Sequence, residues 1–515
     1  MKRPLLAPTL VLCGSLLGLG LGCKSEGAGG SGGSNATGGN GGAGNSGAGG
    51  NSATGGTPAT GGRGGSNATG GNGAGGASVS CSFQVTGTPS SKISTVGIIT
   101  WSTTLPDPTA AQIDFGLDTS YGMTAPVDLT IASYRTLLLG MKTSSTYHYR
   151  VTATNATGSC ASGDYTIATG PPPNGLSAPT VTTMNASALY GGFLVTGQFS
   201  QAMIGSSSGA PAFILDKDGA VVWWYTVSSA DATGVAMSYD GKYIWMNNAN
   251  VPNGMTHVHR VTMDGLEDTD FSTPFFGISH QLTTLPDGSV AFYAYGSNGC
   301  DDIKIFPAEG TPADSATTIT NAKAAHLGTG NCHVNNIQYS PADDTLIFSD
   351  LDNNCLTKIT KTGTMLWVLN GGVGGVQSSF NGGSLVWKGG EHGFTVLGTD
   401  DFVIFNNNSK MPAGSATSWG SAAGDGKGSQ AIEVKLDLGA KTATQTWAYA
   451  PSPAIVNDVL GDAQRLPNGN TMVDFATKAT IQEVDKNGNL LQQITTRTNF
   501  GYIEKRATLY GPPPR

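Results

Sequence analysis

The stretch HVNNIQYSPADDTLIFSDLD, residues 333–352, decides the fold because its pattern recurs along the chain. A strand-like run leads into a turn rich in Asp and Asn, and a second apolar strand follows. Four more segments show this pattern, and they begin at Thr233, His280, His392 and Gly461. Short strands that alternate with turns at a regular period are typical of all-β repeat folds.

The repeat predicts a six-bladed β-propeller over residues 176–515. The segments that begin at His280, His333 and His392 start 53 and 59 residues apart, and third strands such as DIKIF and LTKIT follow them. Before Thr233, GGFLVTG, PAFILDKDG and AVVWWYTV supply three strands of a blade without its inner strand, whereas GYIEKRATLYG near the C-terminus is a lone strand. Joining them completes a sixth blade and removes exposed sheet edges.

The N-terminus predicts export. Lys2 and Arg3 precede an apolar run that is too short for a membrane span, which is typical of a signal peptide over residues 1–22. Cys23 follows LGLG and resembles the lipidated cysteine of bacterial lipoproteins, so we expect a lipid anchor in the outer membrane, periplasmic or at the cell surface. The alternative is that the chain is cleaved nearby and secreted as a free protein.

Composition predicts a disordered linker and restricts the classes of partner. Residues 23–78 are almost wholly Gly, Ser, Asn, Ala and Thr, which cannot bury enough apolar surface to fold and predicts a disordered tether. The net charge of −8 argues against a nucleic-acid partner or a basic membrane-binding surface. We therefore expect contact with a membrane through the lipid anchor alone.

Residues 79–172 resemble a fibronectin type III β-sandwich. Trp101 lies in one predicted strand, and TYHYRV places Tyr147, Tyr149 and Val151 on one face of another. Tyr147 would be the corner tyrosine of such a domain. Cys81 and Cys160 are predicted to form a disulfide. Among Cys300, Cys332 and Cys355 we expect one further disulfide and one remaining thiol, with the pairing open.

Three histidines mark the candidate site. In a propeller the first strand of each blade lines the central channel, and His280, His333 and His392 stand at the entry to that strand in three successive blades. Asn335, two residues after His333, falls on the same strand face. Three converging imidazoles could bind a metal, or hold an oxyanion while one acts as nucleophile. Since no ring of carboxylates accompanies them, binding of an oxyanion is favoured over binding of a metal. The alternative without function is that the three histidines are ordinary solvated residues at strand ends.

HVNNIQYSPADDTLIFSDL and EHGFTVLGTDDFVIFNNNS resemble the bacterial aryl sulfotransferases, a family of six-bladed propellers. The resemblance implies that His392 attacks the sulfur of an aryl sulfate, forms a sulfohistidine and passes the sulfuryl group to a phenol. His333, Asn335 and His280 would hold the sulfuryl oxygens and protonate the leaving phenol. It implies small aryl sulfate and phenol as partners, no nucleotide donor such as PAPS, no other cofactor and no metal.

Two positions depart from the family pattern. Leu351 stands where the family has an arginine, and the triplet Glu391-His392-Gly393 lacks the acidic residue of the family's Gln-His-Asp. Lys505 and Arg506, placed at the start of the closing inner strand, or Lys388, are the predicted substitutes for the missing cation. His257, His259 and His326 are interpreted as loop or outer-strand residues.

Two functions of other kinds remain open. The tethered propeller could be a non-catalytic recognition or adhesion module at the cell surface. It could also be a metal-dependent lyase or hydrolase that uses the three histidines.

Overall fold

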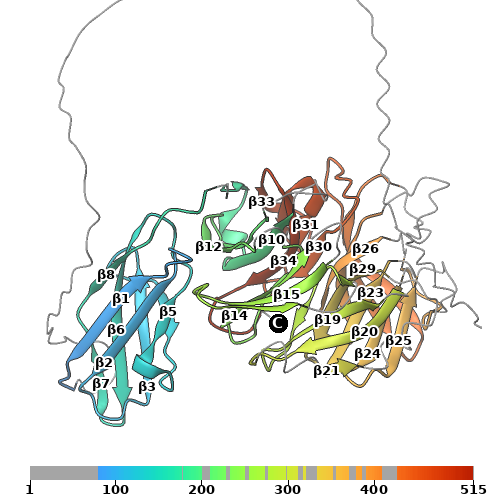
Figure 1. Ribbon diagram of the computed structural model, residues 1–515. Helices are drawn as coiled ribbons and strands as arrows, with labels where there is room; N and C mark the ends of the chain where they lie inside the picture. The colour runs from blue at the N-terminus through green and yellow to red at the C-terminus, as the bar shows by residue number, and fades with distance from the viewer. Residues whose placement is uncertain are drawn as a thin grey trace, which may run out of the picture. The chain divides into compact units, whose positions relative to one another are not determined.

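A computed structural model describes residues 79–513 apart from 175, 177, 200–208, 228–231, 250–254, 273–276, 297–298, 311–316, 320–332, 352–354, 371–377, 386–389 and 409–425. The described residues form strands and short 3-10 turns with no α-helix (Figure 1). The predicted signal peptide, Cys23 and the glycine-rich linker lie outside them. No helix in the described part of the chain has the length and hydrophobicity of a membrane span.

Residues 83–168 form two antiparallel sheets around one core. The first sheet has the order β1-β2-β5, and the second has β4-β3-β6-β7 with β8 also paired to β6. The strands are β1 (Phe83–Pro89), β2 (Gly97–Thr103), β3 (Ala110–Gly116), β4 (Met123–Pro126), β5 (Thr136–Leu138), β6 (Thr146–Asn155), β7 (Gly158–Ala161) and β8 (Tyr165–Ala168), with the 3-10 turn η1 (Ala132–Tyr134). Buried and half-buried residues alternate along β6, as the predicted strand requires.

The details of this region agree with the features read from its sequence. Trp101, Tyr147 and Tyr149 are buried in its core. The Tyr147 hydroxyl accepts a hydrogen bond from the backbone N–H of Lys142 at 2.9 Å, the contact that a corner tyrosine makes. Cys81 and Cys160 form a disulfide. Kinship with fibronectin type III domains stays a prediction.

The rest of the described chain forms six antiparallel sheets, of four or five strands each, that follow one another along the sequence. Their strands are β9 (Thr180–Thr183), β10 (Phe193–Phe199), β11 (Ala212–Leu215), β12 (Val221–Tyr225), β13 (Val235–Met237), β14 (Tyr243–Ala249), β15 (Met255–Thr262), β16 (Asp268–Ser272), β17 (Gly277–Ile278), β18 (Thr283–Thr284), β19 (Val290–Gly296), β20 (Gly299–Phe306), β21 (Thr317–Ile319), β22 (Val334–Ser340), β23 (Thr345–Asp350), β24 (Cys355–Thr360), β25 (Met365–Asn370), β26 (Glu391–Val396), β27 (Asp401–Asn406), β28 (Gln430–Asp437), β29 (Thr442–Tyr449), β30 (Asp462–Arg465), β31 (Thr471–Phe475), β32 (Thr480–Val484), β33 (Leu490–Thr495) and β34 (Asn499–Arg506), with the 3-10 turns η2 (Ala186–Ala188) and η4 (Ala476–Lys478).

The sheets have the predicted strand order. The sheet β22-β23-β24-β25 uses the repeat unit that begins at His333, and β26-β27-β28-β29 uses the unit that begins at His392. The lone C-terminal strand β34 pairs with β10 in the sheet β12-β11-β10-β34, as expected. One addition was not predicted: β9 joins the outer edge of the sheet β30-β31-β32-β33. The all-β class is confirmed, while closure into a ring of six blades stays a prediction.

Hydrogen bonds connect the first strands of successive sheets. Gln281 N–H donates to the Asn335 carbonyl at 3.2 Å, and Gly393 N–H donates to the Gly461 carbonyl at 2.8 Å. Tyr502 N–H in β34 donates to the carbonyl of Thr233 at 2.9 Å. These contacts hold the starts of the inner strands at one level. The apolar faces of the sheets pack against one another and bury side chains such as Trp223 and Trp245.

Candidate functional site

The three predicted histidines lie at the entry to inner strands of three successive sheets. His280 lies between β17 and β18, His333 directly precedes β22, and His392 is the second residue of β26. His392 is buried, whereas His280 and His333 are partly buried. The structure therefore places all three at equivalent points of the repeat.

His280 and His333 are in direct contact. Their Nε2 atoms lie 2.8 Å apart, so one Nε2–H donates to the lone pair of the other. Burial, and then the neighbouring His333 and His392, lower the pKa of His280 well below its usual value. Burial also lowers the pKa of His333, although the Asp350 carboxylate opposes the shift. Such a contact suits two neutral rings, since a proton on both nitrogens would place two donors against each other.

His392 is held in one tautomer by Asn407. The Nδ1 atom of His392 lies 2.6 Å from Asn407 Oδ1. Asn407 Nδ2 donates to the carbonyls of Asn457 at 2.7 Å and Leu460 at 2.9 Å, which fixes the orientation of the amide. Oδ1 must therefore accept the proton of His392 Nδ1, and Nε2 keeps its lone pair. Burial lowers the pKa of His392 to about 4, so the ring is neutral at pH 7.

Asn335 is completely buried beside these rings. Its Nδ2 donates to the carbonyl of Glu391 at 2.6 Å, and the hydroxyl of Tyr502 donates to its backbone carbonyl at 3.0 Å. The side-chain Oδ1 of Asn335 has no hydrogen-bond partner. A buried acceptor without a donor is costly, by about 1–3 kcal/mol, and such an atom next to a cluster of histidines is available to a ligand.

An acidic pair from the next sheet reaches the same level. Asp462 and Asp474 are register partners in β30 and β31, and both are buried. Burial raises the pKa of Asp462 to about 7, and burial together with Asp462 raises that of Asp474 well above its ordinary value. A Cβ added to Gly393 would lie 2.1 Å from Asp462 Oδ1. The Asp462 carboxyl therefore fills the space in which a side chain at 393 would begin.

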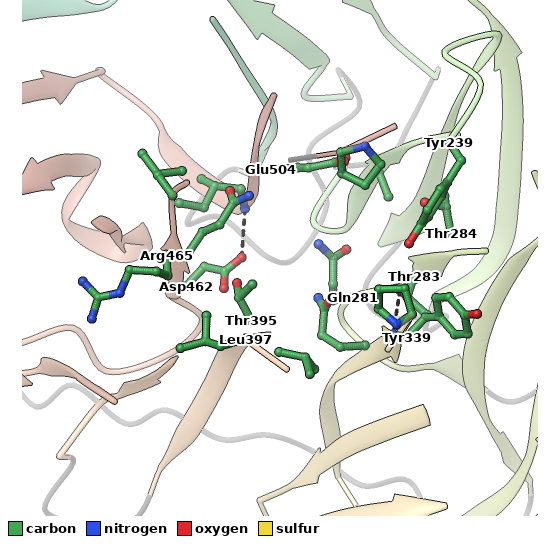
Figure 2. A pocket seen from close by; sticks show the side chains of 18 of the residues that line it. Tyr239, Gln281, Thr283, Thr284, Tyr339, Thr395, Leu397, Asp462, Arg465 and Glu504 are labelled. Atoms are coloured by element: carbon green, nitrogen blue, oxygen red, sulfur yellow. Dashed lines mark hydrogen bonds between the residues drawn. The ribbon is translucent and has the colours of Figure 1, made fainter. Parts of the chain in front are cut away.

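A cavity of about 570 Å³ lies among the inner strands, beyond the histidines (Figure 2). Gln281, Thr395 and Asp462 are among the residues that line it, and none of the three histidines does. On β22 its lining begins at Gln338, about 17 Å along the strand from His333 at ~3.3 Å per residue. The cavity thus extends away from His333 along β22, but Gln281, the residue directly after His280, is part of its lining and connects it to the level of the histidines.

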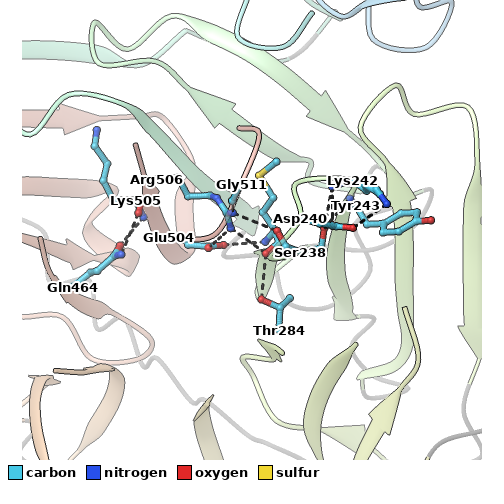
Figure 3. Close-up of polar contacts among 11 residues, drawn as sticks. Ser238, Asp240, Lys242, Tyr243, Thr284, Gln464, Glu504, Lys505, Arg506 and Gly511 are labelled. Atoms are coloured by element: carbon cyan, nitrogen blue, oxygen red, sulfur yellow. Dashed lines mark hydrogen bonds and ion pairs between the residues drawn. The ribbon is translucent and has the colours of Figure 1, made fainter. Parts of the chain in front are cut away.

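The predicted role of Lys505 and Arg506 as cations at the histidines is wrong. They are the last two residues of β34, which begins at Asn499, so they lie at the end of the strand remote from the histidine level. Arg506 donates to Glu504 Oε1 at 2.7 Å and to the carbonyls of Met237 and Gly511 (Figure 3). The Lys505 side chain points away from this cluster, and burial lowers its pKa.

Leu351, at the position of the family arginine, is buried, and its N–H donates to the His333 carbonyl at 2.9 Å. Cys355 carries a free, buried thiol whose pKa is raised by burial. Lys388, His326, Cys332 and the side chain of Cys300 lie outside the described residues.

Sequence reasoning assigned no role to Asn407, Asp462, Asp474 or Tyr502. It also assigned His257 and His259 no role. Among the described residues, these two histidines and Asp270 form the one group of three side chains whose possible metal-ligand atoms lie within 4.8 Å of one another. Among the described residues, His280, His333 and His392 do not form such a group.

The fold and the site define an all-β, propeller-like protein with a cluster of neutral imidazoles at the entry to its inner strands. Residues 304–504 match the family described as arylsulfotransferase (ASST). The resemblance read from the sequence is therefore confirmed for that stretch. The match supports an arylsulfotransferase-like function, with aryl sulfate donors and phenol acceptors in general.

Other comparisons give distant similarities. A protein of unknown function from Bacteroides caccae is 14% identical, with 61% of this chain and 98% of that chain covered and a TM-score of 0.39. The β-propeller domain of Cps50 (Swd1) from Myceliophteria thermophila is 11% identical, with 64% and 92% covered and a TM-score of 0.37. A streptogramin B lyase is 12% identical, with 63% and 90% covered and a TM-score of 0.36. No curated protein matches the chain.

Proposed function

We propose that the protein transfers a sulfuryl group from an aryl sulfate to a phenol through a sulfohistidine at His392. The observation that carries this proposal is the hydrogen bond between His392 Nδ1–H and Asn407 Oδ1. It leaves Nε2 as an unprotonated nucleophile on a ring that is neutral at pH 7.

The first half-reaction forms the Nε2–S bond and breaks the S–O bond to the aryl group, which leaves as a phenolate and takes up a proton. One of the two Nε2 atoms of His280 and His333 carries a proton, and this N–H is the proposed hydrogen-bond donor to the departing oxygen. Because both rings are neutral, the phenolate takes up its proton from solvent. Asn335 Nδ2 has a second N–H beyond the one that reaches Glu391, and this donor suits a sulfuryl oxygen.

The second half-reaction breaks the Nε2–S bond as the phenol oxygen attacks sulfur and gives up its proton. Asp462 supplies the carboxyl that the triplet around His392 lacks, because its carboxyl lies against Gly393. Burial raises the pKa of this carboxyl to about 7, so it can release or accept a proton near neutral pH. The orphaned Oδ1 of Asn335 is an acceptor for the phenol hydroxyl.

The location follows from the N-terminal segment. We propose that the chain is exported and anchored through Cys23, with the glycine-rich segment as a tether and the sandwich as a spacer. The aryl sulfate and phenol then reach the site from outside the cytoplasm, where no nucleotide sulfate donor is required.

The test uses the purified protein with 4-nitrophenyl sulfate as donor and phenol as acceptor, with and without a chelator. Nitrophenol release that needs phenol, survives the chelator and disappears in His392→Ala is expected. Release that is lost with the chelator alone would favour the metal-dependent lyase or hydrolase. Absence of turnover together with binding to a glycan or cell surface would favour the recognition module.

A further inference from the structure

Four side chains gather on the outer two strands of the sheet β13-β14-β15-β16, away from the candidate active site. His257 and His259 are two residues apart on β15, so they share one face of the strand. Asp268 and Asp270 share a face of the neighbouring β16, and His259 is the register partner of Asp270. The pairing therefore brings two imidazoles and two carboxylates together across one strand boundary.

Asp270 contacts both imidazoles. Its two oxygens lie 2.9 and 3.0 Å from His257 Nδ1, and Oδ1 lies 3.9 Å from His259 Nε2. One ligand atom from each of the three residues lies within 4.8 Å of the others. The His257 and Asp270 side chains are 39% and 45% exposed, so they can adjust their positions.

The tautomer of His259 is fixed by its other ring nitrogen. His259 Nδ1 lies 2.8 Å from Asp268 Oδ1, and the second oxygen of that carboxylate accepts a hydrogen bond from the Tyr225 hydroxyl at 3.1 Å. The carboxylate therefore accepts the Nδ1 proton, which leaves a lone pair on Nε2. This Nε2 atom is buried and has no hydrogen-bond partner.

The buried Nε2 lone pair of His259 faces Asp270 Oδ1 at 3.9 Å. Both atoms attract positive charge, so a cation between them would satisfy both. Histidine ligands in metal sites are also commonly oriented in this way: the ring nitrogen that does not bind the metal donates a hydrogen bond to a carboxylate. A second imidazole and a carboxylate complete three protein ligands of the types that zinc prefers. We propose that His257, His259 and Asp270 bind a divalent transition metal such as Zn²⁺, with Asp268 and Tyr225 as supporting residues.

The site needs a small contraction. Tetrahedral zinc with bonds of about 2.0–2.1 Å places its ligand atoms about 3.3 Å apart, and the present atoms lie within 4.8 Å. Binding replaces the hydrogen bond between His257 Nδ1 and Asp270 with a bond from each residue to the metal. The exposed side leaves a fourth position for water, and the metal would tie the edge strand β16 to β15.

The test measures Zn²⁺ bound to the metal-free full chain by equilibrium dialysis, and the absorption of the Co²⁺ form, which reports tetrahedral coordination. One equivalent is expected in the parent protein, and its loss is expected in His259→Ala and in the exposed-site variant Asp270→Asn. The matched control is His148→Ala, because His148 Nδ1 pairs with Asp164 at 2.7 Å without a second imidazole. This control should keep the full equivalent.

A second arm tests the supporting carboxylate. Asp268→Asn should keep the stoichiometry and weaken Zn²⁺ binding about 10- to 100-fold. The proposal is overturned if the parent binds no metal, or if His259→Ala and His148→Ala behave alike. It is also overturned if the equivalent disappears in His392→Ala and remains in Asp270→Asn, since the metal would then belong to the channel. A thermal melt of Asp270→Asn, whose side chain is 45% exposed, separates loss of ligand from loss of fold.

Discussion

Replacing Asn407 by Ala removes the acceptor that fixes the tautomer of His392. The 2.6 Å contact between His392 Nδ1 and Asn407 Oδ1 disappears, and the Gly390 carbonyl at 3.4 Å is left as a long, weak acceptor. An unsatisfied buried donor costs about 1–3 kcal/mol. The reactive Nδ1–H tautomer loses that amount relative to the Nε2–H tautomer, which has no lone pair on Nε2.

This energy sets the size of the expected effect. Because about 1.4 kcal/mol corresponds to a factor of ten, the rate of sulfohistidine formation should fall about 5- to 150-fold. The residual contact with Gly390 favours the lower part of this range. Substrate binding does not use the Nδ1 proton, so KM for the aryl sulfate should change less than kcat.

The assay is a single-turnover measurement of 4-nitrophenol release without acceptor, which reports sulfohistidine formation alone. Asn408→Ala is the matched control, because this neighbouring amide is equally buried and donates to the Gly428 carbonyl at 2.9 Å. Both variants need a thermal melt. A single-turnover rate in Asn407→Ala within twofold of the parent, or an equal loss in Asn408→Ala, would refute the reasoning.

Three further outcomes are expected. Since protonation removes the His392 lone pair and burial lowers its pKa to about 4, the single-turnover rate of sulfohistidine formation should fall as pH decreases through about 4; an acid limb near 6.5 in that half-reaction would contradict this. Gly393→Ala should abolish activity and lower the melting temperature, because its Cβ would lie 2.1 Å from Asp462 Oδ1, whereas Gly398→Ala, with open space around it, should match the parent in both measurements. Cys81→Ser should destabilise the sandwich by about 2–5 kcal/mol in urea unfolding, since the disulfide closes a loop across 79 residues; an unchanged midpoint would argue against that role.

The repeat made the strand order predictable. Each unit carries its turn residues and apolar runs locally, so the sheet that begins near His333 could be assigned without tertiary information, and the equivalence of the three histidines followed. The pairing of the last strand with β10 followed because a lone strand must be paired.

The parts that were missed depend on contacts between distant residues. Asn407 stands in a run of three asparagines, and only the position of its amide against His392 distinguishes it. Asp462 reaches the site from the next sheet because Gly393 has no side chain. Lys505 and Arg506 were misplaced because β34 begins at Asn499, earlier than the sequence pattern suggested.

The metal candidate shows the same limit. His257 and His259 alternate along a strand, which the sequence reveals, yet the carboxylates that face them come from the following strand in a register that the sequence does not specify. Two histidines on one face of an outer strand have no evident purpose until Asp268 and Asp270 are placed beside them.

The pairing of β10 with β34 also has a consequence for biogenesis. Phe193 is a register partner of Arg506, so the sheet that contains β10 lacks its inner strand until β34 has been synthesised. Such distant pairing is slow to form, and it exposes the edge of β10 in the meantime. A nascent or truncated chain that ends before Asn499 would present that edge to chaperones, proteases and other copies of itself. The sheet β12-β11-β10-β34 is therefore among the last parts of the fold to be completed.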